Sequence, residues 1–463
     1  MREVITLQVG QCGNQIGNAF WNLLLLEHEL TSDEDTALSS FFYREQKGRN
    51  NVLRARALLV DMECGPLQET MRSPLGNLFN DTQYIMDVSG AGNNFAHGYF
   101  FYGPQYQDKL CEGLRRNVER CESLQAFSLI HSLGGGTGSG VGSYLLSLLA
   151  DEFNKVTRFS TCVYPSEEND VITSPYNTIL STRELVLSAD CVFPLKNSAL
   201  FSFHQSENPA ASTSATSAPT ADPSRRQKDR GFDLVNLIAA RMLCNVTSSS
   251  RFHGELNVDL NEIYTNLVPF PKLHFLCGAL NIRYPTTAQQ RLRSDYSRTA
   301  LQRAFADVTG PRGQLTGIQG LVLQTSPPIM IASAFLGRGK IILSDFLRCV
   351  SRAQSSFRFP VWNSDACKIG LCGSATPGEE MSVMALYNSS SFAVPLSKEL
   401  QNFQALFRAK AMLHHYTKFT EEETIRQAEY EVFELYEAYR SLQQNVDPSN
   451  GKYEMIDSLF PVL

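Results

Sequence analysis

The stretch GGGTGSG, from Gly134 to Gly140, follows the apolar run Phe127–Ile130 and decides the fold assignment. Five of its seven positions are glycine, which would weaken the interior of a helix or a strand. Glycine lets the backbone approach a ligand closely, and a helix after the stretch would add unpaired N–H groups and a positive dipole end. The stretch therefore predicts a phosphate-binding loop, since a simple flexible turn would need only one or two glycines.

Two common phosphate-binding motifs do not match this loop. A Walker A motif needs a lysine and a hydroxyl residue after the glycines, but Val141 follows Gly140. The dinucleotide spacing GxGxxG does not fit the segment either, which argues against a nucleotide-dependent oxidoreductase on a similar sheet.

The first two hundred residues repeat one pattern, a short apolar strand followed by a polar or glycine-rich turn and a helical pattern. The predicted strands lie at Val4–Val9, Ala57–Val60, Ile85–Met86, Phe127–Ile130 and Cys162–Val163. Strands that alternate with helices predict an α/β fold with a parallel, Rossmann-like sheet and helices on both faces. Ligands bind beyond the carboxyl ends of such strands, where every one of these turns would lie.

The composition changes abruptly over Pro209–Ser224, where every residue except Asp222 is Ala, Ser, Thr or Pro, and a basic run, RRQKDR, follows. Such a segment cannot bury enough apolar area to offset the cost of ordering, which predicts a disordered surface insertion. A helix apolar on several sides resumes after it, with Val235, Ile238 and Met242, and we expect it to be central.

The remaining sequence predicts a second α/β domain and a helical end. LVLQTSPP, IMIASAFL and MSVMALYN have the character of strands, and LSDFLRCVSRA that of a helix. Near the end of the chain an apolar stripe at helical spacing predicts a packed amphipathic helix. The stripe consists of Ala428, Val432, Leu435, Tyr439 and Leu442.

Charge, cysteine content and hydropathy limit the class of protein. The formal net charge of −6, from 41 basic and 47 acidic residues, argues against a nucleic-acid partner. Eleven cysteines without a CxxC pair indicate buried thiols in a reducing compartment rather than a zinc site. The beginning of the chain lacks a signal pattern and no run of eighteen apolar residues occurs, so we expect a cytosolic or nuclear protein with no membrane partner.

Several motifs in order resemble the tubulin superfamily. GGGTGSG is similar to the family's signature, and QVGQCGNQIG, SGAGNNFAHG, SPYN and NVDLNEIYTNLVPFPKLH resemble further tubulin segments. The resemblance covers nearly the whole chain except Pro209–Arg230 and the extreme C-terminus. SSFF, RARALLVDME, DVITSPYN and LVPFPKLH, together with the place of the insertion, resemble the epsilon branch of the family.

The resemblance implies a tubulin-like GTPase fold with a central helix, a second α/β domain and a C-terminal helical hairpin. The implied division is a GTP-binding domain over 1–205, a low-complexity insertion over 206–230, the central helix and intermediate domain over 231–385, and a C-terminal helical domain over 386–463.

The resemblance also implies a GTP or GDP site with Mg²⁺. Its residues would be Gly10, Gln11, Cys12 and Gln15 at the diphosphate and base, Gly90, Ala91, Gly92 and Asn93 at the terminal phosphate, and Ser132, Gly134, Gly135, Gly136, Thr137 and Gly138 around the phosphates. Glu63 would help to hold Mg²⁺ through water, since this ion keeps several waters. The nearby Asp61 is either part of the same site or a structural cap, and both interpretations stay open.

On the nucleoside side, Asp170 matches a ribose-contacting aspartate of the family, and Asn197 and Asn236 match asparagines that read the guanine edge. Phe232 stands where the family usually has a stacking tyrosine, and stacking needs only the ring; a core phenylalanine at the beginning of the helix is the alternative interpretation. Ser174 replaces a glutamate that more often faces the ribose hydroxyls, so we expect an altered ribose contact.

Glu262 carries the sharpest functional hypothesis. The pattern GxxNxDxxE, ending at Glu262, resembles the alpha-like chains, in which this glutamate reaches the nucleotide of the next subunit and orients the attacking water. The resemblance implies that this chain completes GTP hydrolysis in trans, whereas in a monomer Glu262 would be a solvated helix residue.

For the whole protein, the resemblance implies a cytoskeletal protein of the cytoplasm that acts at the centriole, basal body or centrosome, in the organisation of doublet and triplet microtubules. Delta-tubulin, alpha/beta-tubulin and centriolar proteins are the implied partners. An ordinary microtubule lattice subunit and a tubulin-like scaffold without nucleotide remain as alternatives.

Overall fold

The first domain is built on a six-stranded sheet in which all neighbouring strands run parallel. The computed structural model describes residues 2–30, 38–47, 50–166, 171–207, 223–283, 298–318, 328–363 and 365–444. The strand order is β5-β4-β1-β6-β7-β8. The strands are β1 (Glu3–Val9), β4 (Ala57–Asp61), β5 (Tyr84–Met86), β6 (Leu124–Ser132), β7 (Thr157–Tyr164) and β8 (Cys191–Lys196). The predicted parallel sheet is thereby confirmed.

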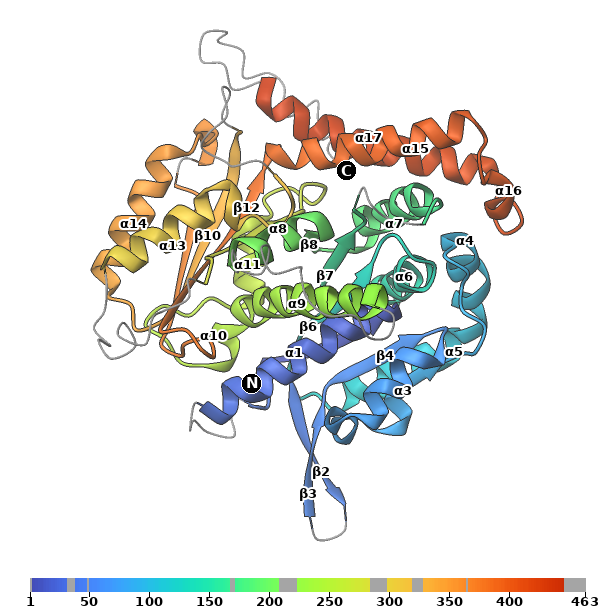
Figure 1. Ribbon diagram of the computed structural model, residues 1–463, viewed down its shortest axis with the longest axis horizontal. Coiled ribbons are helices and arrows are strands. Elements are labelled where there is room, and N and C mark those ends of the chain that lie inside the picture. Colours follow the sequence, from blue (N-terminus) through green and yellow to red (C-terminus); the bar gives the residue numbers. More distant parts are fainter. Residues whose placement is uncertain are drawn as a thin grey trace.

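Helices cover both faces of this sheet, as the strand–helix alternation predicts (Figure 1). Side chains of β1 alternate between the two sides: Ile5 and Leu7 pack with α5, α6 and α7, whereas Val4 packs with α1 and α9. The helices of this domain are α1 (Gly10–Leu30), α3 (Cys64–Arg72), α4 (Phe95–His97), α5 (Gly103–Glu119), α6 (Gly142–Glu152), α7 (Ser174–Ser188) and α8 (Asn197–Glu207). Shorter helical turns are η1 (Pro74–Leu78), η2 (Asp81–Gln83), η3 (Gly98–Tyr102) and η4 (Thr137–Val141).

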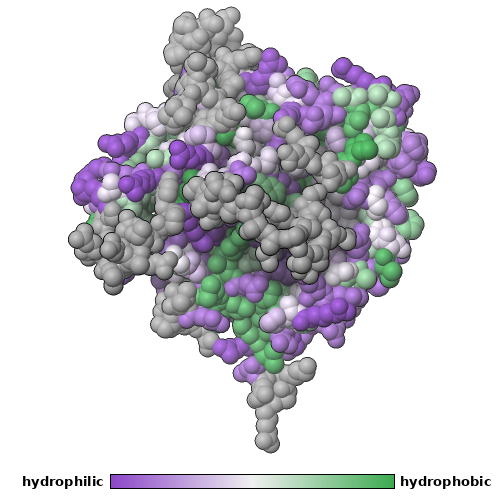
Figure 2. Space-filling model, in the orientation of Figure 1, coloured by the Kyte–Doolittle hydropathy of each residue, from purple (hydrophilic) through white to green (hydrophobic). Residues whose placement is uncertain are grey.

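An antiparallel hairpin, β2 (Phe42–Lys47) and β3 (Asn50–Ala55), projects from the first domain (Figure 1). Figure 2 shows a mostly hydrophilic face with an apolar area in its lower middle, where Figure 1 places α1 and α9. Exposed apolar side chains on these two helices include Leu26, Phe232 and Leu234.

The second domain contains a mixed four-stranded sheet of order β11-β10-β12-β9, which confirms its α/β character. Its strands are β9 (Cys277–Leu280), β10 (Met330–Gly339), β11 (Cys367–Cys372) and β12 (Met381–Ser389). Its helical segments are α10 (Ser248–Arg251), α11 (Leu260–Leu267), α13 (Arg298–Thr309), η6 (Pro311–Gly313), α14 (Leu343–Ser356) and η7 (Val361–Asn363). The strands predicted at IMIASAFL and MSVMALYN and the helix at LSDFLRCVSRA are confirmed. The strand predicted at LVLQTSPP lies outside the described residues except for Pro328.

The central helix α9 (Pro223–Val246) passes between the two sheets and packs along α1 (Figure 1). Val235, Ile238 and Met242 are buried, as expected. The insertion predicted over 206–230 differs from the structure, because α8 runs to Glu207 and α9 begins at Pro223. Proline is favourable at the first helical position and RRQKDR consists mostly of good helix formers, so the helix begins earlier than the apolar pattern does. Residues 208–222 lie outside the described residues.

The C-terminal region is a helical hairpin that packs on α7. It consists of η8 (Ser390–Phe392), α15 (Ala393–Arg408), α16 (Leu413–Tyr416) and α17 (Glu422–Gln444). Ala428, Val432, Leu435 and Tyr439 are buried in the core, which confirms the predicted stripe. At the far end of the hairpin α16 lies beside α4 of the first domain (Figure 1).

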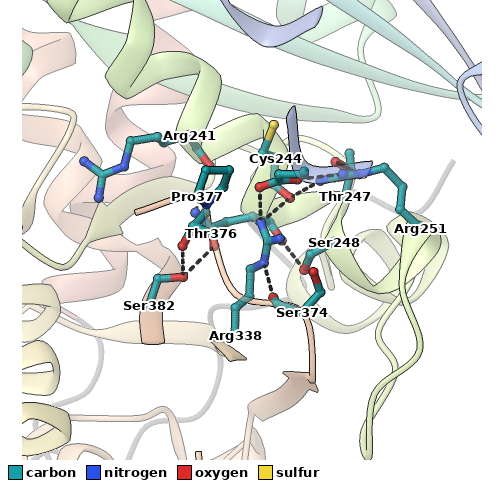
Figure 3. Close-up of polar contacts among 12 residues, drawn as sticks. Arg241, Cys244, Thr247, Ser248, Arg251, Arg338, Ser374, Thr376, Pro377 and Ser382 are labelled. Atoms are coloured by element: carbon teal, nitrogen blue, oxygen red, sulfur yellow. Dashed lines mark hydrogen bonds and ion pairs between the residues drawn. The ribbon is translucent and has the colours of Figure 1, made fainter. Parts of the chain in front are cut away.

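A buried charged cluster joins the two domains. Glu27, near the end of α1, lies 2.6 Å from Arg251 and 2.8 Å from Arg338 of β10, and all three side chains are fully buried. Arg338 also donates to the carbonyls of Ser374 and Cys244, while Arg251 donates to that of Cys244 (Figure 3). Burial alone would raise the pKa of Glu27, but the two arginine charges outweigh it and hold that pKa below its usual value.

Candidate functional site

The first loop of the candidate site is the turn from β1 into α1. Gly10 has a φ of +74°, and a Cβ there would lie 2.8 Å from the backbone nitrogen of Gly138, so only glycine fits. Asn14 holds this turn, because its buried amide donates to the carbonyls of Gly10 at 2.9 Å and Val60 at 3.2 Å. The sequence patterns give no indication of this role for Asn14.

The glycine-rich loop contacts the other loops through backbone atoms. A Cβ on Gly136 would lie 2.7 Å from the backbone nitrogen of Asn94, and one on Gly138 would lie 2.7 Å from Ser132 Oγ. The loop therefore has its glycines where neighbouring segments leave no room for a side chain. Its second half forms η4, in which the Gly140 N–H donates to Gly136 at 2.8 Å. The helix expected after the motif thus begins inside it.

The third loop, residues 90–93, has a left-handed backbone. Gly90, Gly92 and Asn93 have φ values of +67°, +57° and +52°. A Cβ on Gly90 would lie 2.6 Å from Glu63 Oε1, so the predicted metal-side carboxylate lies against this loop. Ala91 is buried and its Cβ would lie 2.9 Å from a Cβ on Gly136, so the structure brings all three predicted phosphate loops together.

Asn177 and Ser174 of α7 brace two of these loops. The buried Asn177 amide donates to the carbonyls of Asn93 at 2.8 Å and Gly134 at 2.9 Å. Ser174 is buried and its hydroxyl donates to the Gly134 carbonyl at 3.3 Å. The motif SPYN marks this segment in the sequence, but nothing in the pattern separates Asn177 from its neighbours.

The environment of Asp61 and Glu63 fits a magnesium ion that is held mainly by phosphates and water. Glu63 is exposed, and Asp61 Oδ1 accepts its backbone N–H at 3.3 Å. No side chain caps the start of α3 at Glu63, so this bond fixes the turn before the helix. Burial raises the pKa of Asp61 to about 7, and its Oδ2 has no hydrogen-bond partner among the described residues. No group of three or more His, Cys, Asp and Glu in the described ranges is placed to hold a metal by itself. A hydrated ion with few protein ligands suits these residues.

His131, which sequence reasoning missed, supports the glycine-rich loop from beneath. Its fully buried ring lies between the Gly138 carbonyl, at 2.8 Å from Nδ1, and Ser160 Oγ, at 3.0 Å from Nε2. Burial lowers the pKa of His131 to about 4, so the ring is neutral at pH 7. The loop is therefore supported without a fixed positive charge.

The residues predicted at the base and ribose come from two places: Gln11, Cys12, Gln15, Asp170 and Asn197 follow the ends of β1, β7 and β8 in the sequence, whereas Phe232 and Asn236 belong to α9. Gln11 is exposed, Cys12, Gln15 and Asn197 are partly buried, and Asn236 is buried. Loss of hydration inside the protein raises the pKa of the Cys12 thiol to about 12, so this thiol keeps its proton at pH 7 and is not a reactive thiolate. Phe232 is exposed and makes an edge contact with Phe201, with ring centroids 5.5 Å apart, so it is not a core residue. Asp170 lies outside the described residues.

Glu262 lies at the opposite edge of the first sheet. Its neighbours on α11 contact the beginnings of strands: Asp259 forms an ion pair with Arg2, just before β1, and Asn261 accepts from Thr157, the first residue of β7. The seven residues of β1 separate that edge from Gly10 by roughly 20 Å. Glu262 therefore does not reach this chain's own phosphate loops.

The immediate surroundings of Glu262 are polar and open. Its carboxylate lies 2.6 Å from Lys368 of β11 and keeps 39% of its side-chain exposure. Its backbone N–H donates to Asp259 Oδ1 at 2.7 Å. This bond caps the N-terminus of α11 and holds Glu262 in the first turn of that helix.

None of the helices that the structure describes combines the length and the apolar character that a bilayer span requires.

Comparison with known proteins agrees with this geometry. Residues 3–205 match the model of the Tubulin/FtsZ family, GTPase domain. The chain is 40% identical over 442 residues to the tubulin epsilon chain of Homo sapiens, covering 90% of each, and 38% identical over 469 residues to that of Mus musculus, covering 96% of each. It is 33% identical over 445 residues to a tubulin beta chain of Pyropia yezoensis, covering 92% of this chain and 90% of that one. On this coverage and identity, the chain belongs to the tubulin family.

Proposed function

We propose that the three-loop site binds GTP or GDP with Mg²⁺, in a cytoskeletal protein of the tubulin family. The observation that carries this proposal is the contact of three glycine-bearing loops, 10–15, 90–93 and 134–138, which follow β1, β5 and β6 of one parallel sheet. Their backbone N–H groups and the N-termini of α1 and α6 favour a polyphosphate. Asn197 and Asn236 would read the guanine edge.

The roles of the residues in binding follow from their positions. Gly10, Gly136 and Gly138 keep the backbone close enough for its N–H groups to reach phosphate oxygens. Glu63 would orient water around Mg²⁺, which when bound supplies positive charge that offsets the phosphates. Since His131 is neutral, selectivity for a highly charged ligand rests on backbone dipoles and this ion.

The ligand is tested by denaturing the purified protein and separating the released small molecules by ion exchange. We expect GTP or GDP in nearly one-to-one ratio with the chain. Release of a dinucleotide would support an oxidoreductase instead, and a folded protein that neither carries nor takes up nucleotide would support the scaffold alternative.

We further propose that Glu262 completes the GTP site of a neighbouring subunit. The position of Glu262 at the edge opposite to the phosphate loops supports this role, because stacked subunits would bring one edge against the other. There Glu262 would orient a water for attack on the γ-phosphorus. The new P–O bond forms as the bond to the β-phosphate oxygen breaks, which leaves GDP and inorganic phosphate.

Glu262→Ala should slow hydrolysis roughly 100-fold within a confirmed assembly and leave GTP binding unchanged. Glu255→Ala is the matched control, because Glu255 is an exposed acid of the same segment. Unchanged turnover of Glu262→Ala in the assembly would remove the idea, and equal loss in both variants would indicate a general effect of charge.

The similarity to tubulin epsilon chains supports a place at the centriole, basal body or centrosome, with other tubulins as partners, delta-tubulin or alpha/beta-tubulin among them. The test is to image a tagged copy in ciliated, dividing cells beside a centriole marker and a general microtubule marker. We expect concentration at centrioles or basal bodies. Uniform decoration of cytoplasmic and spindle microtubules would show an ordinary lattice subunit.

A further inference from the structure

The helix α16 of the C-terminal hairpin and the turn before it contact α7 and the start of α4, beside the candidate nucleotide loops. The Asn94 amide donates to the His415 carbonyl at 3.0 Å. The Tyr176 hydroxyl donates to the Ala411 carbonyl at 2.8 Å. The two segments are more than 230 residues apart in the sequence, as the separation of 235 for Tyr176 and Ala411 shows.

Asn177 is the point at which the loops and the hairpin meet. Its amide group donates to the carbonyls of Asn93 and Gly134, and its Oδ1 accepts from the Phe95 N–H at 2.8 Å. The hydroxyl of Tyr416 lies 2.5 Å from the same Oδ1. Two donor hydrogens and two acceptor sites are thereby all used in a fully buried amide.

Tyr416 is suited to fix this amide. Its ring is fully buried and stacks on Tyr176 with centroids 4.9 Å apart, so its hydroxyl has little freedom. A second acceptor, the Thr173 carbonyl, lies 3.2 Å away. Burial raises the pKa of Tyr416, so the hydroxyl keeps its proton and can donate.

The non-glycine residues with a left-handed backbone in the described residues lie near the contact between the hairpin and the nucleotide loops. Positive φ values at non-glycine residues occur at Asn93, at 52°, and at Lys410 and Met412, at 50° and 59°. Asn93 belongs to the candidate phosphate loop, and the other two flank Ala411 in the hairpin turn. Such conformations persist only where surrounding contacts hold them, and α7 supplies such contacts on both sides, from Asn177 to the Asn93 carbonyl and from Tyr176 to the Ala411 carbonyl.

We propose that Tyr416 is a positioning residue for the nucleotide site, which acts through Asn177 and couples the C-terminal hairpin to the phosphate loops. The proposal rests on the proposed binding of GTP. Because Asn177 holds loops 90–93 and 134–138 together, a ligand that orders these loops will also order the hairpin turn. The coupling is reciprocal, so a partner that binds the hairpin and changes its conformation will change the affinity for nucleotide.

The test compares GTP affinity in the full-length protein and two variants. Tyr416→Phe removes the hydroxyl and keeps the ring, and we expect GTP to bind about fivefold more weakly. Tyr439→Phe is the matched control, because Tyr439 is an equally buried tyrosine of the same hairpin whose hydroxyl accepts from Phe275 N–H at 3.2 Å instead. Its affinity should remain that of the wild type. Equal affinity in all three proteins would overturn the proposal.

A second readout separates coupling from a general loss of stability. In the wild type and in Tyr439→Phe, GTP should slow amide hydrogen exchange in residues 410–419, whereas in Tyr416→Phe this protection should be lost. Protection that persists in Tyr416→Phe would overturn the coupling. If Tyr416→Phe does not fold, Asn94→Ser, which keeps a cap for α4 but loses the reach to His415, should show the same loss of protection. Failure of the wild type to bind GTP would contradict the proposed function itself, which is a separate outcome.

Discussion

The phosphate-loop site and the domain junction hold distant segments together by opposite means. At the junction, three fully buried charges, Glu27, Arg251 and Arg338, form direct ion pairs. At the loops, the bracing side chains Asn177, Ser174 and Tyr416 are neutral and mostly bond backbone carbonyls.

The difference indicates where a charged ligand belongs. Buried charge demands a fixed, fully paired geometry, because an unpaired ion in the interior is costly. Neutral amides and hydroxyls can fix the conformation of a loop without adding a net charge, so the charge at the site comes from the ligand. The junction is thus a fixed connection between domains, whereas the loops keep the neutral surroundings that suit the polyphosphate and metal we propose for them.

The largest expected effect concerns the junction. Glu27→Gln leaves two buried arginines without a counter-charge, so we expect a loss of about 3–5 kcal/mol in the free energy of unfolding. Urea unfolding followed by circular dichroism measures it. Glu112→Gln is the control, because its pair with Arg116 is exposed and should matter by less than about 0.5 kcal/mol. Equal, small losses in both variants would show that the buried cluster does not hold the domains together.

A smaller effect on stability, but a larger one on binding, is expected in the loops. In Gly136→Ala the new Cβ meets the backbone of Asn94, so stability should fall by about 2 kcal/mol and GTP affinity by at least tenfold. Calorimetric titration measures the affinity. Gly65→Ala in α3 has open space around it and should bind GTP normally. Normal binding by Gly136→Ala would mean that the three loops need not touch.

The third effect concerns stability alone and is a pH dependence that comes from the neutral His131 beside the glycine-rich loop. Because His131 has a pKa of about 4 in the folded chain and an ordinary value of 6.5, the unfolded chain binds a proton first as the pH falls. Stability is therefore lost between pH 6.5 and pH 4, by about 2 kcal/mol at pH 5. His131→Gln should remove that part of the decline in unfolding curves at pH 7 and pH 5. An unchanged slope would show that His131 does not titrate as described.

Local patterns were sufficient to predict much of this molecule. The apolar strands, their glycine-rich turns and the stripe of α17 are contiguous signals, and they correctly predicted the parallel sheet and the packed final helix. The grouping of the three glycine-bearing loops was implied by the family resemblance, and the structure shows that these loops touch. The start of α9 was wrong because RRQKDR carries helix propensity without an apolar pattern.

Contacts between distant residues could not be predicted in this way. Asn177 and Tyr416 are 239 positions apart, and Glu27 and Arg338 are 311 positions apart. The sequence around each of these residues gives no sign of its distant partner. The hydrogen bond or ion pair forms only because the fold brings the two residues together. Likewise, the sequence marks Glu262 as a motif residue, but only the sheet shows that it lies opposite the loops.

The most direct measurement of the central claim is a calorimetric titration of nucleotide-free protein with GTP and, separately, with ATP, each with Mg²⁺. The account predicts one GTP site per chain and at least tenfold weaker binding of ATP, since we propose that Asn197 and Asn236 read the guanine edge. A folded protein that binds neither nucleotide, or both equally, would contradict the assignment of the three loops as a guanine-nucleotide site.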